Sequence, residues 1–219
     1  MPHLDRNDDV FILDLGDSEN RINPSWGAEI LALLDEVGEA AGPRALVTAA
    51  TGKFWSNGLD LAWCGDDADR LDQVVAVAES ILAAILILPV PTVAAVQGHA
   101  YAAGGLMALA HDYRVMRADR GYFCLPEIDL HMPFPAGMGA LVQAKLTPTT
   151  ARDVMVTGRR YGGTDAEAAA IVDAAVTSEE VSPRALVMAG ELAPKADPVM
   201  GRIKSGMYGD VYRALRHQS

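Results

Sequence analysis

The alternation of strand-like and helix-like segments in the first hundred residues is the feature that most limits the fold. Residues 10–15 are rich in β-forming side chains, and residues 44–50 and 92–96 are mostly apolar, as is expected of strands covered on both faces. Between these runs, residues 24–37 and 71–88 repeat apolar side chains at helical spacing. This order predicts βαβ units, and therefore an α/β fold with a parallel sheet.

The rest of the chain changes from mixed to mainly helical. Two short strands are predicted at 112–116 and 121–125, after a buried helix that begins near Gly104. We expect a β/α core over residues 1–145 and a helical region over residues 146–219. The later segments are helices at 137–146, 148–157, 164–170, 183–192 and 199–215, with a short strand at 171–176.

Two glycine-bearing turns follow predicted strands directly, at residues 52–60 and 98–105. Loops at the carboxyl edge of such a sheet commonly hold a ligand. Gly58 permits an unusual backbone angle, so that the N–H of Leu59 can point outward. The N–H of Ala103 lies where a helix begins, and the positive end of the helix dipole adds to it. We therefore expect these two N–H groups to hold an acyl oxygen between them.

Glu127 is a lone carboxylate among apolar neighbours, just after a proline. An apolar wall raises the pKa of a carboxyl toward neutrality, which suits a general base. Asp129 is close in sequence, but on a strand its side chain would face the other way. The residues alone leave two readings open, since a single Pro-Glu-Ile also fits a solvated strand edge.

Composition argues against several classes of function. The chain carries 18 basic and 29 acidic residues, a net charge of −11, and its basic residues are scattered. A nucleic-acid-binding surface needs clustered Lys and Arg, so no nucleic-acid partner is predicted. Cys64 and Cys124 are too few for a disulfide framework, and no zinc-type spacing occurs, so no metal is predicted.

The location of the protein is predicted from its ends and its longest apolar run. Residues 1–9 are polar and acidic, unlike a secretory signal. Residues 81–96 are broken by Pro89 and Pro91 and are too short to span a bilayer. Residues 216–219 are not a peroxisomal-type address. A cytoplasmic protein that does not enter a membrane is expected.

Three motifs together carry a resemblance to a known family. Residues 47–61, 95–105 and 125–129 resemble, in order and spacing, the enoyl-CoA hydratase/isomerase (crotonase) superfamily, and the resemblance extends over residues 10–215. It implies a crotonase-like spiral of ββα repeats with a C-terminal helical extension that makes trimer contacts, often in dimers of trimers. It also implies an acyl-CoA thioester as the ligand, with coenzyme A as part of the substrate and no separate cofactor.

The resemblance also implies roles for individual residues. Leu59 and Ala103 become the oxyanion donors and Glu127 the catalytic acid-base group. Asn57 either touches the acyl chain or only makes the turn. The substrate-binding residues are expected to be Trp55, Ser56, Asn57, Gly58, Gly104 and Leu106.

Hydratases of this family use two glutamates, and the position of the first is Leu106 here. A single carboxylate is enough to move a proton from the α-carbon to the γ-carbon, as enoyl-CoA isomerases do. Residues 98–104, 109–117 and 127–130 look like the short isomerases of plants and peroxisomes. We therefore expect an enoyl-CoA isomerase. The alternatives are a related hydratase, hydrolase or decarboxylase, or a non-catalytic acyl-CoA-binding protein.

Overall fold

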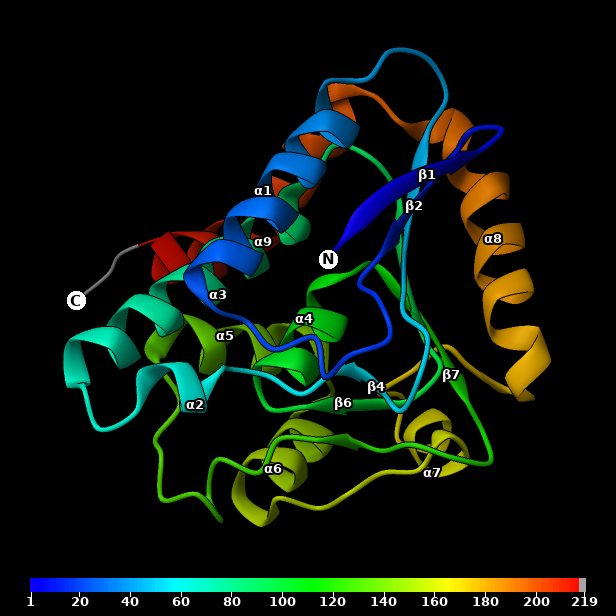
Figure 1. Ribbon diagram of the computed structural model, residues 1–219. Coiled ribbons are helices and arrows are strands. Elements are labelled where there is room, and N and C mark those ends of the chain that lie inside the picture. Colours follow the sequence, from blue (N-terminus) through cyan, green and yellow to red (C-terminus); the bar gives the residue numbers. More distant parts are fainter. Residues whose placement is uncertain (217–219) are drawn as a thin grey trace.

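Two sheets form the centre of the computed structural model, which describes residues 1–216 (Figure 1). The larger sheet has six strands in the order β1-β2-β3-β5-β7-β9. The β1–β2 pair is antiparallel and the remaining pairs are parallel, as predicted for βαβ units. The strands are β1 (His3–Asn7), β2 (Val10–Asp14), β3 (Ala45–Ala49), β5 (Thr92–Val96), β7 (Tyr113–Arg117) and β9 (Ala174–Val176).

The smaller sheet consists of three short parallel strands, β4 (Phe54–Ser56), β6 (His99–Tyr101) and β8 (Phe123–Cys124). Each of these strands follows directly after β3, β5 or β7, so successive strand pairs contribute one strand to each sheet. Helices α2 (Leu61–Cys64) and α3 (Ala68–Ile87) follow the first pair, and α4 (Ala103–Ala110) follows the second. This repetition is the predicted spiral of ββα units.

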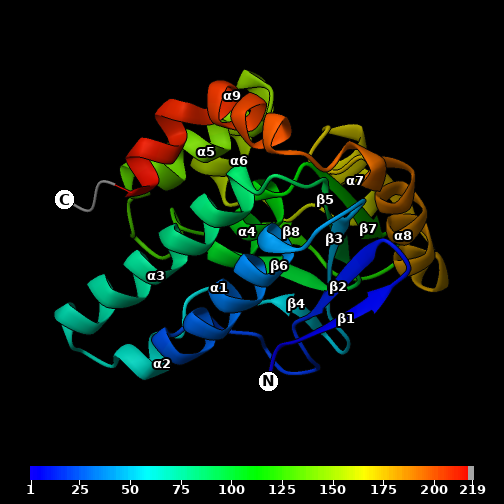
Figure 2. The same cartoon turned by 90° about the horizontal axis from the view of Figure 1, so that it is seen from above.

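Helix α1 (Pro24–Glu39) begins where the sequence places a cap and a proline. The side chain of Asn23 accepts a hydrogen bond from the N–H of Trp26, and Pro24 occupies the first turn. Helices α1 and α3 pack side by side, as seen from above in Figure 2. A Cβ at Gly27 would lie 2.1 Å from Cγ1 of Val77, so the crossing needs glycine there.

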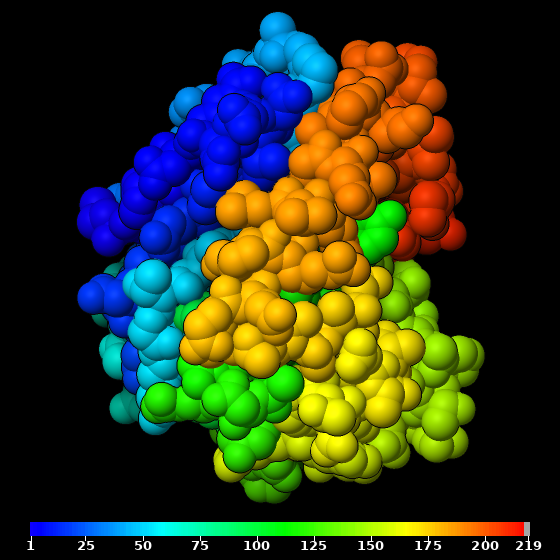
Figure 3. All heavy atoms as spheres, turned by 90° about the vertical axis from the view of Figure 1, so that its right-hand side faces the viewer, coloured from blue at the N-terminus to red at the C-terminus, as the bar shows by residue number. Residues whose placement is uncertain are grey.

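Helix α8 (Val181–Leu192) covers the opposite face of the six-stranded sheet, and Figure 3 views the molecule from that side. Its buried residues Val181, Ala185 and Ala189 pack on apolar side chains of the strands. Those side chains include Val47 of β3 and Val93 of β5. The strands are thus apolar on both faces, as their sequences indicate.

The region after residue 145 shares the core of the preceding residues. Strand β9 pairs with β7, and α9 (Pro198–Arg216) packs against α3 and against α5 (Ala136–Lys145). Val211 and Leu215 of α9 belong to the main core. The other elements here are α6 (Pro148–Thr157), α7 (Gly163–Ala168) and the 3-10 helices Ser178–Glu180 and Ala193–Lys195.

Several segments differ from the sequence-based expectation. Strands β4 and β6 lie within residues 52–60 and 98–105, for which the sequence predicts turns, and helix α2 was not predicted. Strand β1 was not predicted, because His3–Asn7 is polar and mostly exposed, and pairing with β2 alone makes it a strand. Residues 127–130 form a turn and not the continuation of a strand. The latter difference changes the geometry of the site described next.

Candidate active site

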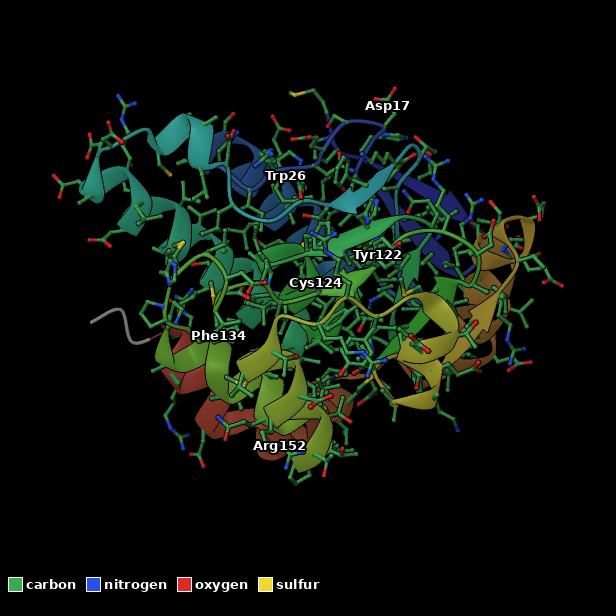
Figure 4. All side chains as sticks on the ribbon, turned by 90° about the horizontal axis from the view of Figure 1, so that it is seen from below. Asp17, Trp26, Tyr122, Cys124, Phe134 and Arg152 are labelled. Carbon is green, nitrogen blue, oxygen red and sulfur yellow. The ribbon has the colours of Figure 1, made fainter. Side chains whose placement is uncertain are left out.

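A cavity of about 970 Å³ lies between the two glycine-bearing turns, α3 and the segment that leads to α5. Figure 4 shows the molecule from below, with Cys124 of β8 near the centre and Phe134 just ahead of α5. Both residues line the cavity, as do Asn57, Leu59 and Ala103. The wall on the side of α3, α5 and α9 is mainly apolar and includes Leu71, Val75, Ala76, Met138 and Ala214. The cavity therefore combines a polar turn region with an apolar region.

The backbone around Leu59 is fixed by hydrogen bonds, but the N–H of Leu59 itself makes none among the described residues. Backbone hydrogen bonds from Ile22 N to Gly58 O (2.8 Å) and from Asp60 N to Ile22 O (2.9 Å) fix the chain on either side of it. Within residues 1–216, the Leu59 N–H donates no hydrogen bond. Gly58 has a φ of +77°, the conformation that its glycine identity was expected to permit.

The N–H of Ala103 is also free among the described residues, because it is the first N–H of α4 and has no partner within the helix. Ala102, directly before it, has a φ of +48°, which is strained for a residue with a Cβ. Hydrogen bonds from Ala102 N to Cys124 O (2.9 Å) and from Leu106 N to Ala102 O (3.0 Å) hold this conformation. The surroundings thus impose the strain at the point where the N–H meets the cavity.

The two turns touch each other. A Cβ at Gly58 would lie 3.2 Å from the backbone N of Ala103 and 2.9 Å from the O of Tyr101. A Cβ at Gly104 would lie 2.4 Å from the O of Ser56. Glycine at both positions allows this approach, which brings the two unbonded N–H groups to one wall of the cavity.

Glu127 lies in the turn after β8 and lines the same cavity. Its Oε2 is buried and accepts no hydrogen bond from any residue in the described part of the chain. Burial raises the pKa of Glu127 to about 7. A carboxyl with this pKa is about half ionised at neutral pH, which suits a group that takes up and releases a proton.

Asp129 corrects one sequence-based expectation. It was expected to point away from Glu127 because a strand was assumed, but both side chains line the cavity. Residues 127–130 form a turn closed by hydrogen bonds from Asp129 N and Leu130 N to Pro126 O, so strand alternation does not apply. Asp129 itself is exposed, whereas Glu127 is half-buried.

The expected substrate-binding residues fall into two groups. Asn57 lines the cavity. Trp55 and Ser56 are fully buried behind the wall, where Trp55 Nε1 donates to Thr48 O (3.2 Å) and Ser56 Oγ donates to Asn20 O (2.8 Å). Leu106 is also fully buried in the core. Trp55, Ser56, Leu106, Gly58 and Gly104 are not among the residues that line the cavity.

Sequence reasoning missed other lining residues, notably Tyr101, Arg160 and Glu79. Glu79 is a carboxylate on the apolar side of a predicted helix. A charged residue on such a face is an exception to the helical pattern, and this exception could have indicated Glu79 as a functional residue. Arg160 reaches the cavity from the segment after α6, which no local pattern indicates.

The two thiols are not reactive groups. Cys124 lines the cavity, but burial raises its pKa to about 11 and its Sγ donates to Gly158 O (3.2 Å). Cys64 is buried and its pKa is raised by burial. Across residues 1–216, no three His, Cys, Asp or Glu side chains are grouped so as to hold a metal ion. No helix in the same range is long and apolar enough to cross a membrane.

The fold and the cavity together define a crotonase-like protein. Solved structures of this fold superimpose over nearly the whole chain. An enoyl-CoA isomerase from Mycobacterium tuberculosis matches with a TM-score of 0.89 and 22% identity, over 99% of this chain and 95% of its own. An enoyl-CoA hydratase/isomerase family protein from Pseudomonas syringae matches with a TM-score of 0.90 and 23% identity, over 98% and 93%.

The chain belongs to the enoyl-CoA hydratase/isomerase family, whose model matches residues 6–219. Among curated proteins, enoyl-CoA delta isomerase 2, peroxisomal, from Arabidopsis thaliana is 40% identical over 96% of this chain and 93% of its own length. Enoyl-CoA delta isomerase 3 from the same plant is 39% identical over 98% and 95%. A carnitinyl-CoA dehydratase from Escherichia coli (strain K12) is 31% identical over 77% of this chain. The predicted family is therefore confirmed.

Proposed function

We propose that the protein is an enoyl-CoA isomerase that converts a β,γ-enoyl-CoA into the conjugated α,β form. The observation that carries the proposal is the pairing, in one cavity, of a carboxyl whose buried Oε2 has no partner and two backbone N–H groups without partners, as far as residues 1–216 extend. The Arabidopsis relatives described as enoyl-CoA delta isomerases support this choice within the family. No cofactor is needed, because coenzyme A is part of the substrate.

The reaction begins with removal of a proton from the α-carbon. Ionised Glu127 takes this proton, and the electron pair moves onto the thioester oxygen to form an enolate. The N–H groups of Leu59 and Ala103 donate hydrogen bonds to that oxygen, each contributing on the order of 3 kcal/mol in a site without water. The dipole of α4 adds to the Ala103 donor.

The reaction ends with return of the same proton at the γ-carbon. Protonated Glu127 donates it, the thioester carbonyl re-forms, and the double bond shifts to the α,β position. Glu127 is then ionised again, so no further acid or base is consumed. A pKa of about 7, raised by burial, favours both steps because the group is neither a strong acid nor a strong base.

One acid at the reacting carbons argues against a hydratase. Addition of water needs a second group to position the water, and the buried Leu106 cannot do this. Glu79 also lines the cavity, but burial alone raises its pKa, with no contribution from Glu127. We therefore propose Glu127 alone as the acid-base group of the reaction.

Assembly and location belong to the same proposal. We infer a homotrimer or a dimer of trimers, in which residues 146–219 make the contacts between subunits. Val199, Ile203 and Met207 support this, since they are exposed apolar residues on α9. We also propose a cytoplasmic protein without nucleic-acid or membrane partners. That location depends in part on the C-terminal residues, of which 217–219 lie outside the described part of the chain.

The proposal is tested by mixing the purified protein with β,γ-enoyl-CoA thioesters of several chain lengths. We expect the absorbance of the conjugated thioester to rise, with neither loss of the double bond nor release of free coenzyme A. Formation of a hydroxyacyl-CoA would identify a hydratase, and free thiol a hydrolase. Loss of carbon dioxide from a carboxyacyl-CoA would identify a decarboxylase. Binding of every thioester without turnover would indicate a non-catalytic protein and would refute the proposal.

A further inference from the structure

A second carboxyl in the cavity has no role in the reaction described above. Glu79 lies on α3, is only 6% exposed, and lines the cavity. No charged residue of the described chain contributes to its pKa, and no hydrogen bond lowers it. Burying a carboxyl costs free energy unless hydrogen bonds compensate for the lost hydration, and no residue of the described chain donates one to Glu79. An unpartnered group of this kind needs an explanation.

The position of Glu79 along α3 shows which part of the cavity it faces. The lining residues of α3 follow one stripe of the helix, namely Leu71, Asp72, Val75, Ala76 and Glu79, and Glu79 is the last of them along the chain and the one that is buried. Glu79 therefore lies at the inner end of the stripe. The apolar wall to which it belongs also contains Met138 and Ala214. A thioester held at the turns would extend its acyl chain into this region.

The chemistry of the group limits what it can bind there. Burial raises the pKa of Glu79, and a carboxyl accepts a hydrogen bond from a hydroxyl in either protonation state. A neutral carboxyl has one O–H donor and acceptor oxygens, and it pairs well with a hydroxyl or a carbonyl. A fully apolar chain would leave it unpaired, and the site would discriminate against such a chain.

We propose that Glu79 is a specificity-determining residue, which hydrogen-bonds an oxygen-bearing substituent on the acyl chain of the substrate. The proposal rests on the proposed function only in taking an acyl-CoA as the ligand. It assigns the enzyme to acyl-CoA thioesters that carry a hydroxyl or carbonyl beyond the reacting carbons. Glu79 has no part in the proton transfer, which Glu127 carries out.

The test measures binding and not turnover. Saturated medium-chain acyl-CoA thioesters, with a hydroxyl at each carbon in turn from the γ-carbon to the chain end, are compared with the unsubstituted thioester by calorimetry. We expect at least one hydroxylated ligand to bind the wild-type protein about tenfold more tightly, the size of one well-placed hydrogen bond to a buried group. The absence of any preference at every position would overturn the proposal.

Three variants test whether the carboxyl of Glu79 causes the preference for hydroxylated ligands. Glu79→Leu is expected to abolish or reverse it and to raise the thermal midpoint, because the buried polar group is removed. Glu79→Gln should keep most of it, since an amide also donates and accepts. Gln73→Leu, an exposed polar residue of the same helix that does not line the cavity, is the matched control and should keep the wild-type preference. An equal change for hydroxylated and plain ligands in Glu79→Leu would show a purely structural role.

Failure of this inference and failure of the proposed function give different results. Without isomerase activity, the binding preference would still be measurable with the saturated ligands. Without a binding preference, the isomerase assay on unsubstituted β,γ-enoyl-CoA would be unaffected.

Discussion

Two buried polar regions of this protein are built in opposite ways. Around Asp112, each group has a partner: its Oδ2 accepts from Thr92 N (2.9 Å), Thr92 Oγ1 (3.0 Å) and Lys204 Nζ (2.6 Å). Lys204 also donates to Val90 O (2.7 Å), and these contacts join α9 to the start of β5. In the cavity, by contrast, Oε2 of Glu127 and the N–H groups of Leu59 and Ala103 lack partners within residues 1–216.

The difference separates a structural polar cluster from a site prepared for a ligand. Satisfied buried groups hold elements together, and removing one partner exposes the other to the full cost of burial. Unsatisfied groups destabilise the empty protein but are available to a substrate and to its transition state. Five substitutions or measurements test this contrast, and they are ordered by the size of the expected effect.

Glu127→Gln should give the largest effect, and it should be on activity. We expect kcat/KM for a β,γ-enoyl-CoA to fall about 10⁴-fold, or about 5 kcal/mol of transition-state stabilisation, because the amide takes no proton. The unfolding free energy at pH 8 should not decrease, since a buried charge is removed. Steady-state kinetics and urea unfolding measure the two quantities. Activity that survives in this variant would reject Glu127 as the base.

Asp112→Ala should reduce stability and leave activity nearly unchanged, the opposite of Glu127→Gln. It leaves Lys204 buried without its carboxylate, so we expect the unfolding free energy to fall by about 4 kcal/mol. Below the unfolding transition, kcat/KM should stay within a few-fold of wild type, because Asp112 does not line the cavity. Urea unfolding measures the loss, and Asp119→Ala, which removes an exposed carboxylate paired with Arg117, is the matched control with a loss below about 1 kcal/mol. Equal losses in the two variants would contradict the contrast.

The pH dependence of stability should distinguish Glu127 from an ordinary surface carboxyl. Burial raises its folded-state pKa to about 7 from 4.5, so the folded protein favours the protonated form. The contribution of Glu127 to the free energy of unfolding is fully present below pH 4.5. As the pH rises to about 7 this contribution is lost, and the free energy of unfolding falls by about 3 kcal/mol. Glu127→Gln should lack this part of the slope, which unfolding of both proteins between pH 4.5 and 8 measures. Parallel curves would show that the carboxyl is not desolvated.

Over the same interval the activity should move in the opposite direction. The base must be ionised to take a proton, so kcat/KM should rise with pH through an apparent pKa near 7, where burial has raised the pKa of Glu127. Stability would thus fall while activity rises, as expected of a group placed for function.

Ala102→Gly should give the smallest effect. Glycine adopts the φ of +48° without the penalty of a Cβ, so we expect the unfolding free energy to rise by about 1 kcal/mol. The more flexible backbone should hold the Ala103 N–H less firmly, so kcat should fall a few-fold while KM changes little. A decrease in stability, measured by urea unfolding, would show that Ala102 is not strained.

Much of the fold could be predicted from local patterns. The β3 and β5 strands are continuous apolar runs, and α1 has its cap at Asn23 and a proline after it. Strand β1 could not be predicted, because its polar residues become a strand only through pairing with β2. The turn at Glu127 was mistaken for a strand because apolar residues on both sides of it, such as Leu125 and Ile128, fit either structure.

The site could be predicted only in part. Gly58 indicates where one backbone N–H becomes available, because few other residues adopt its φ of +77°. At the second turn the positive φ lies at Ala102, where the residue type does not indicate it. Trp55 and Ser56 belong to the same motif, yet they face the core, and motif membership does not tell which way a side chain points. Glu79 and Arg160 reach the cavity from segments far along the chain.

The amino-acid sequence by itself determined the strands of the apolar runs, the longer helices, the two glycine-bearing segments, the solitary Glu127 and the family, since each depends on residues near one another in the chain. Tertiary structure alone decided which buried polar groups are satisfied. The carboxylate of Asp112 accepts a hydrogen bond from Lys204, which lies 92 residues away in the chain. The Oε2 atom of Glu127 has no partner within residues 1–216 because none of the residues packed around it donates a hydrogen bond. Burial and hydrogen bonding are properties of the assembled core, and they separate the carboxyl of Asp112, which has partners, from that of Glu127, which we propose as the base.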